Sequence, residues 1–188
     1  MSILREVTQE RHQAIEALPF VQYLLHGGIT REHYVMYLAE MFEIYRHLET
    51  LAMLEGLMTD MPELARADRI QQDLKELDPD YQHDVTPAGR EYLRYLRDLF
   101  AGHHPEQLFA HIYVRHLGDM YGGKLIARRV PGSGRWYEFD NRADLVKRFN
   151  SHLSMDLADE ALRAFDWFGR IFGDLWQRIH MDVCDSTS

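Results

Sequence analysis

A histidine and a glutamate one helical turn apart are the first residues whose types and spacing could do chemistry. His12 lies in the segment LREVTQERHQAIE, and Glu16 follows it by four residues. Residues four apart lie on the same face of an α-helix, so the carboxylate can hold the imidazole ring and its tautomer. Arg5 lies on the same stripe, seven residues before His12. The pattern indicates either a supported metal ligand or an ordinary polar pair on a surface helix.

The segment HLGDMYGGK, residues 116–124, interrupts what otherwise has the pattern of one long helix. Gly118, Gly122 and Gly123 fall within six residues, beside Asp119. Each glycine costs a helix interior roughly 1 kcal/mol relative to alanine. Three glycines in this position therefore need a structural or functional reason.

Gly118 and Gly122 are four residues apart, and Arg115 and His111 continue roughly the same stripe toward the N-terminus. A stripe of glycines lets another group approach the backbone closely. That group is either a second helix or a flat ligand lying against a helix that must also bend. Asp119 favours the ligand slightly, because close helix packing gains little from a carboxylate at its edge.

Other metal and catalytic motifs are missing from the sequence. A di-iron bundle of the ferritin type needs Glu-x-x-His pairs, and no glutamate here has a histidine three residues later. The zinc motif His-Glu-x-x-His, the nucleophile elbow G-x-S-x-G and a phosphate loop are also absent. The single cysteine, Cys184, excludes an intrachain disulfide and agrees with a reducing, cytoplasmic compartment.

Composition limits the classes of partner. The chain has 188 residues, of which 46% are hydrophobic, so we expect a folded domain with a sizeable core. A net charge of −9 argues against nucleic acid as the main partner. The early charges of the N-terminal segment argue against a signal peptide, and no run approaches the ~20 apolar residues of a membrane span. We therefore expect a soluble protein without a membrane anchor.

Helical periodicity dominates, which predicts an all-α, single-domain bundle of about eight helices. We expect the domain over residues 1–181 and a C-terminal tail over 182–188. Ser2, Thr30 and Thr86 are the expected N-caps of three helices. Residues 131–140, PGSGRWYEFD, are the one place where a short strand or extended turn could form. The expected helices cover residues 2–18, 19–26, 31–57, 62–77, 87–100, 105–130, 142–152 and 155–180, each with approximate ends.

Two of these motifs together resemble those of the biliverdin-forming haem oxygenases of the soluble, bacterial and cyanobacterial type. HLGDMYGGK, preceded by AHIYVR, is similar to the distal-helix signature of that family, and TQERHQAIEALPF is similar to its proximal segment. The motifs occur in the family's order and at about its spacing, and the helical pattern agrees over nearly the whole chain. The resemblance implies a haem held between a proximal helix and a kinked distal helix.

The resemblance also implies roles for individual residues. His12 matches the proximal histidine that binds the haem iron, Glu16 the residue that steadies it, and Arg5 a basic position that pairs with a propionate. Gly118, Gly122 and Gly123 match the distal glycines whose bare backbone lies over the haem. Asp119 matches the aspartate that orders distal water, and Tyr113 and Arg115 match positions that line its hydrogen-bond network.

Further positions match the haem pocket or depart from the family pattern. Phe165 matches an aromatic of the pocket, and Lys147 and Arg148 fall near the second basic group that binds a propionate. Tyr121 stands where the family often has a small hydroxyl residue, and Phe168 stands where it often has an amide. The resemblance therefore implies the reaction class but not which meso carbon is attacked.

The activity implied is that of an oxidoreductase that converts haem, as substrate and cofactor, with O2 to biliverdin, ferrous iron and carbon monoxide. Electrons must come from an external donor, a ferredoxin or a flavin-dependent reductase, because the chain has no flavin or iron–sulfur motif. We expect a monomer or weak dimer. The alternative is a haem-binding sensor or carrier that has the same fold but no turnover.

Overall fold

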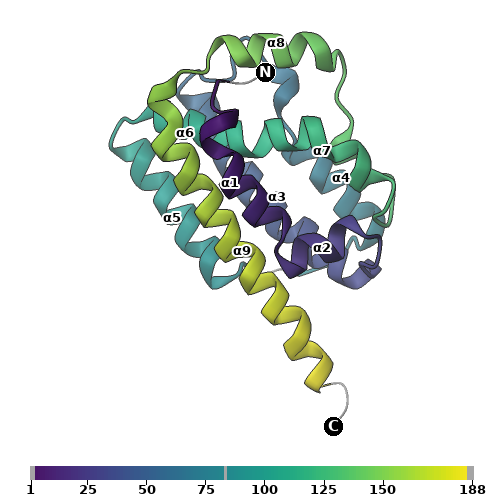
Figure 1. The fold of residues 1–188 in the computed structure, drawn as a ribbon. Helices are drawn as coiled ribbons and strands as arrows, with labels where there is room; N and C mark the ends of the chain where they lie inside the picture. Colours follow the sequence, from purple (N-terminus) through teal and green to yellow (C-terminus); the bar gives the residue numbers. More distant parts are fainter. Residues whose placement is uncertain (1–2, 83, 186–188) are drawn as a thin grey trace.

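The computed structural model describes residues 3–82 and 84–185, with the side chains of 182–185 left aside. In this part of the chain the structure is helical and contains no β-strand (Figure 1). The α-helices are α1 (Arg5–Glu16), α2 (Pro19–Leu25), α3 (Arg31–Leu54), α4 (Ala67–Leu77), α5 (Pro87–Ala101), α6 (Pro105–Ile112), α7 (Gly118–Ala127), α8 (Arg142–Ser151) and α9 (Ala158–Asp185).

Four short helical turns complete the described elements. Three are 3-10 turns, η1 (Pro62–Leu64), η3 (Arg135–Tyr137) and η4 (Met155–Leu157), and one is a π-helical turn, η2 (Tyr113–Leu117). Because η2 joins α6 to α7 without a break, the described residues form eight helical rods. The prediction of an all-α bundle of about eight helices is confirmed.

Local sequence explains where two of the long helices begin. The Thr30 hydroxyl accepts a hydrogen bond from the His33 backbone N–H at 3.2 Å, and the Thr86 hydroxyl accepts one from the Gly89 N–H at 3.0 Å. Each bond satisfies one of the backbone donors that a helix start leaves open. The predicted caps of α3 and α5 are therefore confirmed. Ser2, the third expected cap, lies outside the described residues.

Helix α3 forms the centre of the core. Fourteen of its 24 residues are buried, because α4, α5 and α6 all pack against it. Two buried carboxylates on α3 tie neighbouring elements to it. Glu49 accepts hydrogen bonds from the backbone N–H groups of Arg66 and Ala67, at 2.6 and 3.0 Å, and so caps α4 from a distance. Glu40 accepts bonds from the N–H and hydroxyl of Thr86 at the start of α5.

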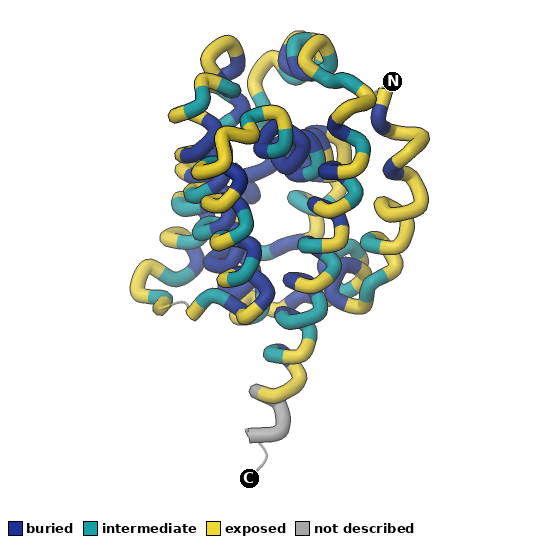
Figure 2. Tube along the Cα trace, turned by 90° about the vertical axis from the view of Figure 1, so that its left-hand side faces the viewer, coloured by how far each residue is buried: buried dark blue, intermediate teal, exposed yellow. Residues whose placement is uncertain are grey.

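Helix α1 is an outer element. It lies along α9 on the outside of the bundle (Figure 1), and its only buried residue among those described is Thr8. Figure 2 shows that the chain that starts at the N-terminus is mostly exposed along this helix. The C-terminal end of α9 extends past the other helices and continues to Asp185, beyond residue 181. None of the described helices is both long and apolar enough to cross a membrane.

The segment 131–140 does not form the short strand that its sequence allows. Gly132 and Gly134 adopt positive φ angles of 83° and 66°, which turn the chain into η3. The buried carboxylate of Asp73 then accepts hydrogen bonds from the backbone N–H groups of Arg135 and Trp136, at 3.0 and 2.9 Å. Because Asp73 lies on α4, this tertiary contact takes up the donors that a strand would have offered to a partner strand.

Candidate active site

The π-helical turn η2 sets which side chains of the α6–α7 rod point inward. A π turn holds more residues than an α turn, so it lets two consecutive residues face the core. Arg115 and His116 are both buried, and both contact α3. His116 Nε2 lies 2.8 Å from Glu49 Oε1. The side chains that follow η2 therefore point in other directions than an uninterrupted α-helix would give them, starting at Gly118.

Gly118 and Gly122 present a bare helix face. Both are exposed, and a Cβ atom placed on either of them would meet nothing within 4 Å. Tight packing of another helix on these two positions is therefore excluded among the described residues. Leu125, three residues after Gly122, shares the face and is 48% exposed. The face is apolar and open to a ligand.

Gly123 lies on a different side of α7. A Cβ on this residue would come within 2.6 Å of the Tyr137 ring, so the glycine is needed for α7 to pack on η3. The structure places Gly123 against the protein and not on the open face with Gly118 and Gly122. Close packing of the protein explains this third glycine.

Arg115 and His111 do not continue the glycine stripe, so that expectation is wrong. His111 is fully buried between Tyr92, whose hydroxyl lies 2.9 Å from Nδ1, and Glu160, whose carboxylate lies 3.0 Å from Nε2. The Arg115 guanidinium lies 3.6 Å from the centroid of the Phe168 ring. The π turn is the reason, because it shifts α7 relative to α6 by a fraction of a turn.

Asp119 is the central carboxylate of the site. One oxygen, Oδ2, accepts hydrogen bonds from the Tyr45 hydroxyl at 2.5 Å and from the Trp136 indole N–H at 2.9 Å. Burial raises the pKa of Asp119, although the Arg115 guanidinium and both donors act to lower it. Among the described residues, Oδ1 has no hydrogen-bond partner, which leaves it for water.

Arg115 supplies the positive charge of this region. Burial acts against its charged form, but the neighbouring Tyr45, Tyr37 and Asp119 raise the pKa of Arg115 above its ordinary value. Its Nε atom is buried and has no hydrogen-bond partner among the described atoms. A buried donor without a partner marks a place where an ordered water or a ligand would be stabilised.

Helix α1 meets the α6–α7 rod through two hydroxyl groups. Thr8 Oγ1 lies 3.5 Å from Tyr113 Oη, and both residues are buried. His12 is one turn beyond Thr8 on α1, and Gly118 is one π turn beyond Tyr113 on the other rod. His12 and Gly118 thus each lie about one turn from the contact between the two rods.

The His12 side chain is half exposed and supported by one carboxylate. Its Nδ1 lies 3.6 Å from Glu16 Oε1, and the two side chains are 54% and 53% exposed. The Phe165 ring, from α9, lies edge-on to the imidazole with a centroid distance of 6.1 Å. Because Nδ1 faces Glu16, Nε2 is the ring nitrogen available to an incoming ligand.

The candidate propionate-binding residues differ in how far they are engaged. Arg5 and Lys147 are exposed and form no ion pair among the described side chains. Arg148 is bound to Glu63 and Asp144 through its guanidinium, and also to the Asp60 carbonyl. Arg5 and Lys147 can therefore take up an anionic group without breaking an existing bond, whereas Arg148 cannot.

The two residues that depart from the family pattern are both placed by the structure. The Tyr121 ring is 57% exposed and lies under the Arg142 guanidinium, 5.4 Å from it, at the rim of the open face. Phe168 is buried in the core, where it supports Arg115. The Tyr121 ring therefore stands at the edge of the site, whereas Phe168 lies behind it.

Sequence reasoning missed two residues of the site, Tyr45 and Trp136. Tyr45 is one of several apolar-face residues of α3, and Trp136 lies in the irregular segment 131–140 of the sequence, so neither has a signal in its local pattern. Both reach Asp119 across long stretches of chain, 74 and 17 residues. Only the fold shows that they meet.

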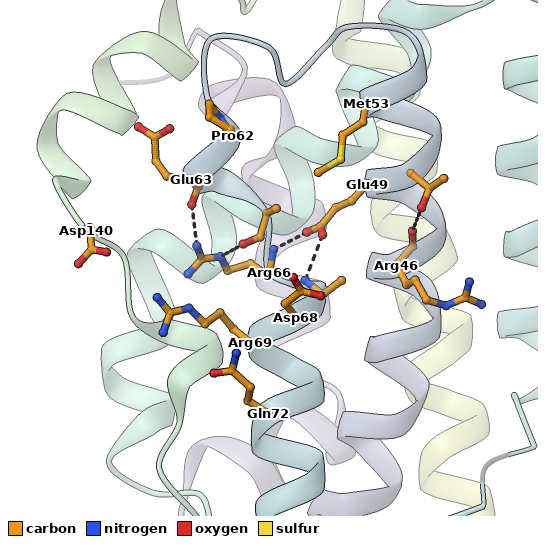
Figure 3. A pocket seen from close by; sticks show the side chains of 13 residues that line it. Arg46, Glu49, Met53, Pro62, Glu63, Arg66, Asp68, Arg69, Gln72 and Asp140 are labelled. Carbon is orange, nitrogen blue, oxygen red and sulfur yellow. Dashed lines mark hydrogen bonds between the residues drawn. The ribbon is translucent and has the colours of Figure 1, made fainter.

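A hollow of about 700 Å³ lies elsewhere, between α3 and α4 (Figure 3). Its lining carries both signs of charge, and the backbone groups of Arg66 and Ala67 already occupy the Glu49 carboxylate. No group of three or more potential metal ligands occurs among the described residues. The geometry that can do chemistry therefore remains the region of His12, Asp119 and the two open glycines.

Comparison with known proteins relates the chain to one family. Residues 1–174 match the family model described as Heme oxygenase. Heme oxygenase 1 from Rattus norvegicus is 30% identical over 151 residues, which cover 72% of this chain and 52% of the relative. Heme oxygenase 2 from the cyanobacterium Synechocystis is 32% identical over 155 residues, which cover 73% of this chain and 61% of the relative. The matches thus span between half and two thirds of these two relatives.

Solved structures extend the likeness to the fold. Heme oxygenase-2 from Synechocystis, in complex with heme and NO, superposes with a TM-score of 0.85 at 26% identity, over 98% of this chain and 88% of that one. Heme oxygenase from Leptospira interrogans gives a TM-score of 0.78 at 26% identity, over 92% and 98% of the two chains. With the family model matching nearly the whole length, this chain belongs to the heme oxygenase family.

Proposed function

We propose that this protein is a haem oxygenase, an oxidoreductase that cleaves haem with O2 and reducing equivalents to biliverdin, Fe2+ and CO. The observation that carries the proposal is the open glycine face of α7, on a rod that contacts helix α1 through Thr8 and Tyr113, one turn from the half-exposed imidazole of His12. A flat ligand would take a metal-binding nitrogen from α1 and lie against the bare backbone of α7. Family membership supports the same activity.

The residues present fit a haem. A Cβ placed on Gly118 or Gly122 would have no protein atom within 4 Å, so a planar ring can approach the backbone there. A neutral imidazole is a common axial ligand of haem iron, and His12 has an exposed ring with Nε2 available. Phe165 adds an aromatic edge beside the imidazole.

When bound, haem supplies the iron at which O2 is activated and the meso carbon that is oxidised. His12 Nε2 would bind the iron, with the Glu16 carboxylate, 3.6 Å from Nδ1, favouring the tautomer that leaves Nε2 free. Arg5 and Lys147 would bind the propionates. Gly118 and Gly122 would leave room for a small diatomic substrate, which a larger side chain would exclude.

Asp119 would control protons on the glycine side. With Oδ2 held by Tyr45 and Trp136, Oδ1 is the oxygen that can order water. A carboxyl group whose pKa is raised by burial exchanges protons more readily near neutral pH than an ordinary aspartate. Arg115, with one free buried N–H, would help to hold that water.

The partners follow from the chemistry that the chain lacks. No flavin or iron–sulfur motif is present, so a ferredoxin or a flavin-dependent reductase would supply the electrons. We infer a cytoplasmic protein that acts as a monomer or weak dimer, with one domain over residues 1–181. The lone cysteine supports the reducing compartment.

The test is a haem titration followed by turnover. The purified protein is mixed with haem, the Soret band is recorded, and ascorbate is then added in air. We expect the Soret band to decay and a bilin to appear, with its isomer identified by chromatography. A stable haem complex that yields no bilin with ascorbate or with a ferredoxin system would identify a sensor or carrier. The lack of any haem complex would contradict both functions.

A further inference from the structure

Trp136 lies at the junction of the site and the rest of the fold. It belongs to η3, between α7 and α8, and its side chain is fully buried. Its indole N–H donates a hydrogen bond to Asp119 Oδ2 at 2.9 Å. A buried tryptophan needs a partner for this donor, and here the partner is the carboxylate that the proposed reaction depends on.

Several contacts fix the position of Trp136. The Trp136 backbone N–H donates to Asp73 Oδ2 at 2.9 Å, and the Asp73 carboxylate is only 1% exposed. The Tyr137 ring is stacked on the indole at 4.7 Å, and the Tyr45 ring meets it edge-on at 5.4 Å. Asp73, on α4, thus holds the turn that places the indole, so the direction of its N–H is set by the fold.

Tyr45 and Trp136 approach the same oxygen of Asp119 from different elements. Tyr45 comes from α3, and Trp136 comes from η3. Two donors on one oxygen restrain the carboxylate more firmly than one, because rotation about the Cβ–Cγ bond would break both hydrogen bonds. Without the indole N–H, the Tyr45 hydroxyl alone would oppose that rotation.

We propose that Trp136 is a positioning residue for the reaction: its indole N–H, held by Asp73, orients the Asp119 carboxylate so that Oδ1 faces the water of the glycine side. The inference rests on the proposed function for its consequence in turnover, but not for the hydrogen bond itself. A phenylalanine at this position would fill most of the same space without offering a donor. The indole nitrogen is therefore the feature to test.

Two variants separate the donor from the ring. Trp136→Phe removes the N–H and part of the ring. Trp136→benzothienylalanine replaces the N–H by sulfur and keeps the shape, so it retains packing on Tyr137. Trp176→Phe is the matched control, because Trp176 packs on Tyr23 and His180 on the outer part of α9.

The first measurement uses the haem-free protein. Carbon-13 NMR of labelled aspartate, with the Asp119 signal assigned by Asp119→Asn, follows the titration of this carboxyl group. A hydrogen bond to the charged form stabilises it, so we expect Asp119 to titrate at higher pH in both Trp136 variants and unchanged in Trp176→Phe. An unchanged titration in the benzothienylalanine variant would overturn the inference, whatever the wild-type protein does with haem.

The second measurement is turnover. We expect unchanged haem affinity in the Soret titration, a fall in the rate of bilin formation of about 2- to 10-fold, and an acid limb shifted to higher pH. If the wild-type protein forms no bilin, the proposed function fails, while the titration still decides whether Trp136 holds Asp119. If the wild type forms bilin and the benzothienylalanine variant matches it at every pH, the positioning role is wrong.

Discussion

His12 and Asp119, the two residues that define the site, differ in how much of the fold supports them. His12 stands on an exposed helix with one carboxylate beside it, whereas Asp119 is buried and bonded to residues from two other elements. A substitution at His12 should therefore change function alone. A substitution at Asp119 should change both function and stability.

We expect His12→Ala to leave the folded protein intact and to remove most activity. The side chain is 54% exposed, so the free energy of unfolding should change by no more than about 0.5 kcal/mol. The loss of the imidazole should alter the visible spectrum of the haem complex and remove most of the bilin formation. Glu16→Gln keeps the His12 imidazole but removes the charge of the carboxylate beside it. This variant should lower the rate of bilin formation by about 10- to 100-fold. An unchanged spectrum in His12→Ala would show that another residue binds the iron.

We expect Asp119→Ala to bind haem but to divert its chemistry. The rate of bilin formation should fall by about 100-fold or more, the usual contribution of a group that directs protons. Peroxidase-like oxidation of guaiacol should rise in the same samples. The variant leaves the Tyr45 and Trp136 donors without a partner, which costs about 1–3 kcal/mol of stability. Full bilin yield would refute the role given to Asp119.

At the scale of elements, α7 carries neighbouring glycines with opposite functions. Gly122 faces open space, whereas Gly123 faces the Tyr137 ring. In the proposed function, the first leaves room for a ligand at the expense of helix stability, whereas the second lets the helix approach η3. Sequence spacing alone could not separate these roles, because both are glycines in one motif.

The adjacent pair gives a matched test. Gly122→Ala should raise the stability of the haem-free protein by up to about 1 kcal/mol, since alanine is the better helix former and its Cβ meets nothing. The same change should weaken haem binding. Gly123→Ala should instead lower stability by about 1–3 kcal/mol, because its Cβ would lie 2.6 Å from Tyr137. Urea unfolding and Soret titration of both variants check this, and equal effects of the two would contradict it.

The sequence predicted most helices but not the turns that shape the site. Thr30 and Thr86 act within four residues of their partners, so their caps are readable in the local pattern. The turn η3 depends on a hydrogen bond to Asp73, which lies 63 residues before Trp136. The sequence around either residue does not predict this contact. The π turn depends likewise on α3, which receives both Arg115 and His116.

The same division holds for the site residues. His12, Glu16 and the open glycines are recognisable because each motif lies on one helix with a fixed spacing. Tyr45 and Trp136 are not recognisable, since they reach Asp119 from other elements. Arg148 was expected to be available to a propionate, but the fold gives it carboxylate partners on η1 and α8.

At the scale of the whole molecule, buried polar groups join helices that are distant in sequence. His111 on α6 connects Tyr92 of α5 with Glu160 of α9, and the Tyr95 hydroxyl donates to the same carboxylate. Burial lowers the pKa of His111, so the native protein holds this ring neutral. The junction of three helices therefore depends on one uncharged imidazole.

This neutrality predicts a loss of stability in mild acid. When the chain unfolds, His111 regains its ordinary pKa near 6.5 and takes up a proton, whereas the native state does not. Stability should therefore fall as the pH drops below about 6.5, by up to about 1.4 kcal/mol per pH unit from this group. Urea unfolding between pH 7.5 and 5.5 measures the slope.

The contribution of His111 is isolated by comparison. Glutamine at position 111 cannot take up a proton. The free energy of unfolding of His111→Gln should therefore change less steeply with pH, by up to about 1.4 kcal/mol per pH unit. His26→Gln, at an exposed position, serves as the control and should keep the wild-type slope. Equal slopes in His111→Gln and wild type would show that His111 takes up its proton equally in the native and unfolded states, which would contradict the prediction.

The π turn also sets how the gene can change here. Removal of a single codon from the stretch that encodes η2 would convert the rod into one uninterrupted α-helix. Because the five residues of a π turn cover nearly the same rotation as four residues of an α-helix, the bare side of α7 and Asp119 would keep their present direction. The rod would instead lose the extra residue that lets Arg115 and His116 both reach α3. A deletion within α7 itself, by contrast, would rotate every later residue by about 100° about the helix axis.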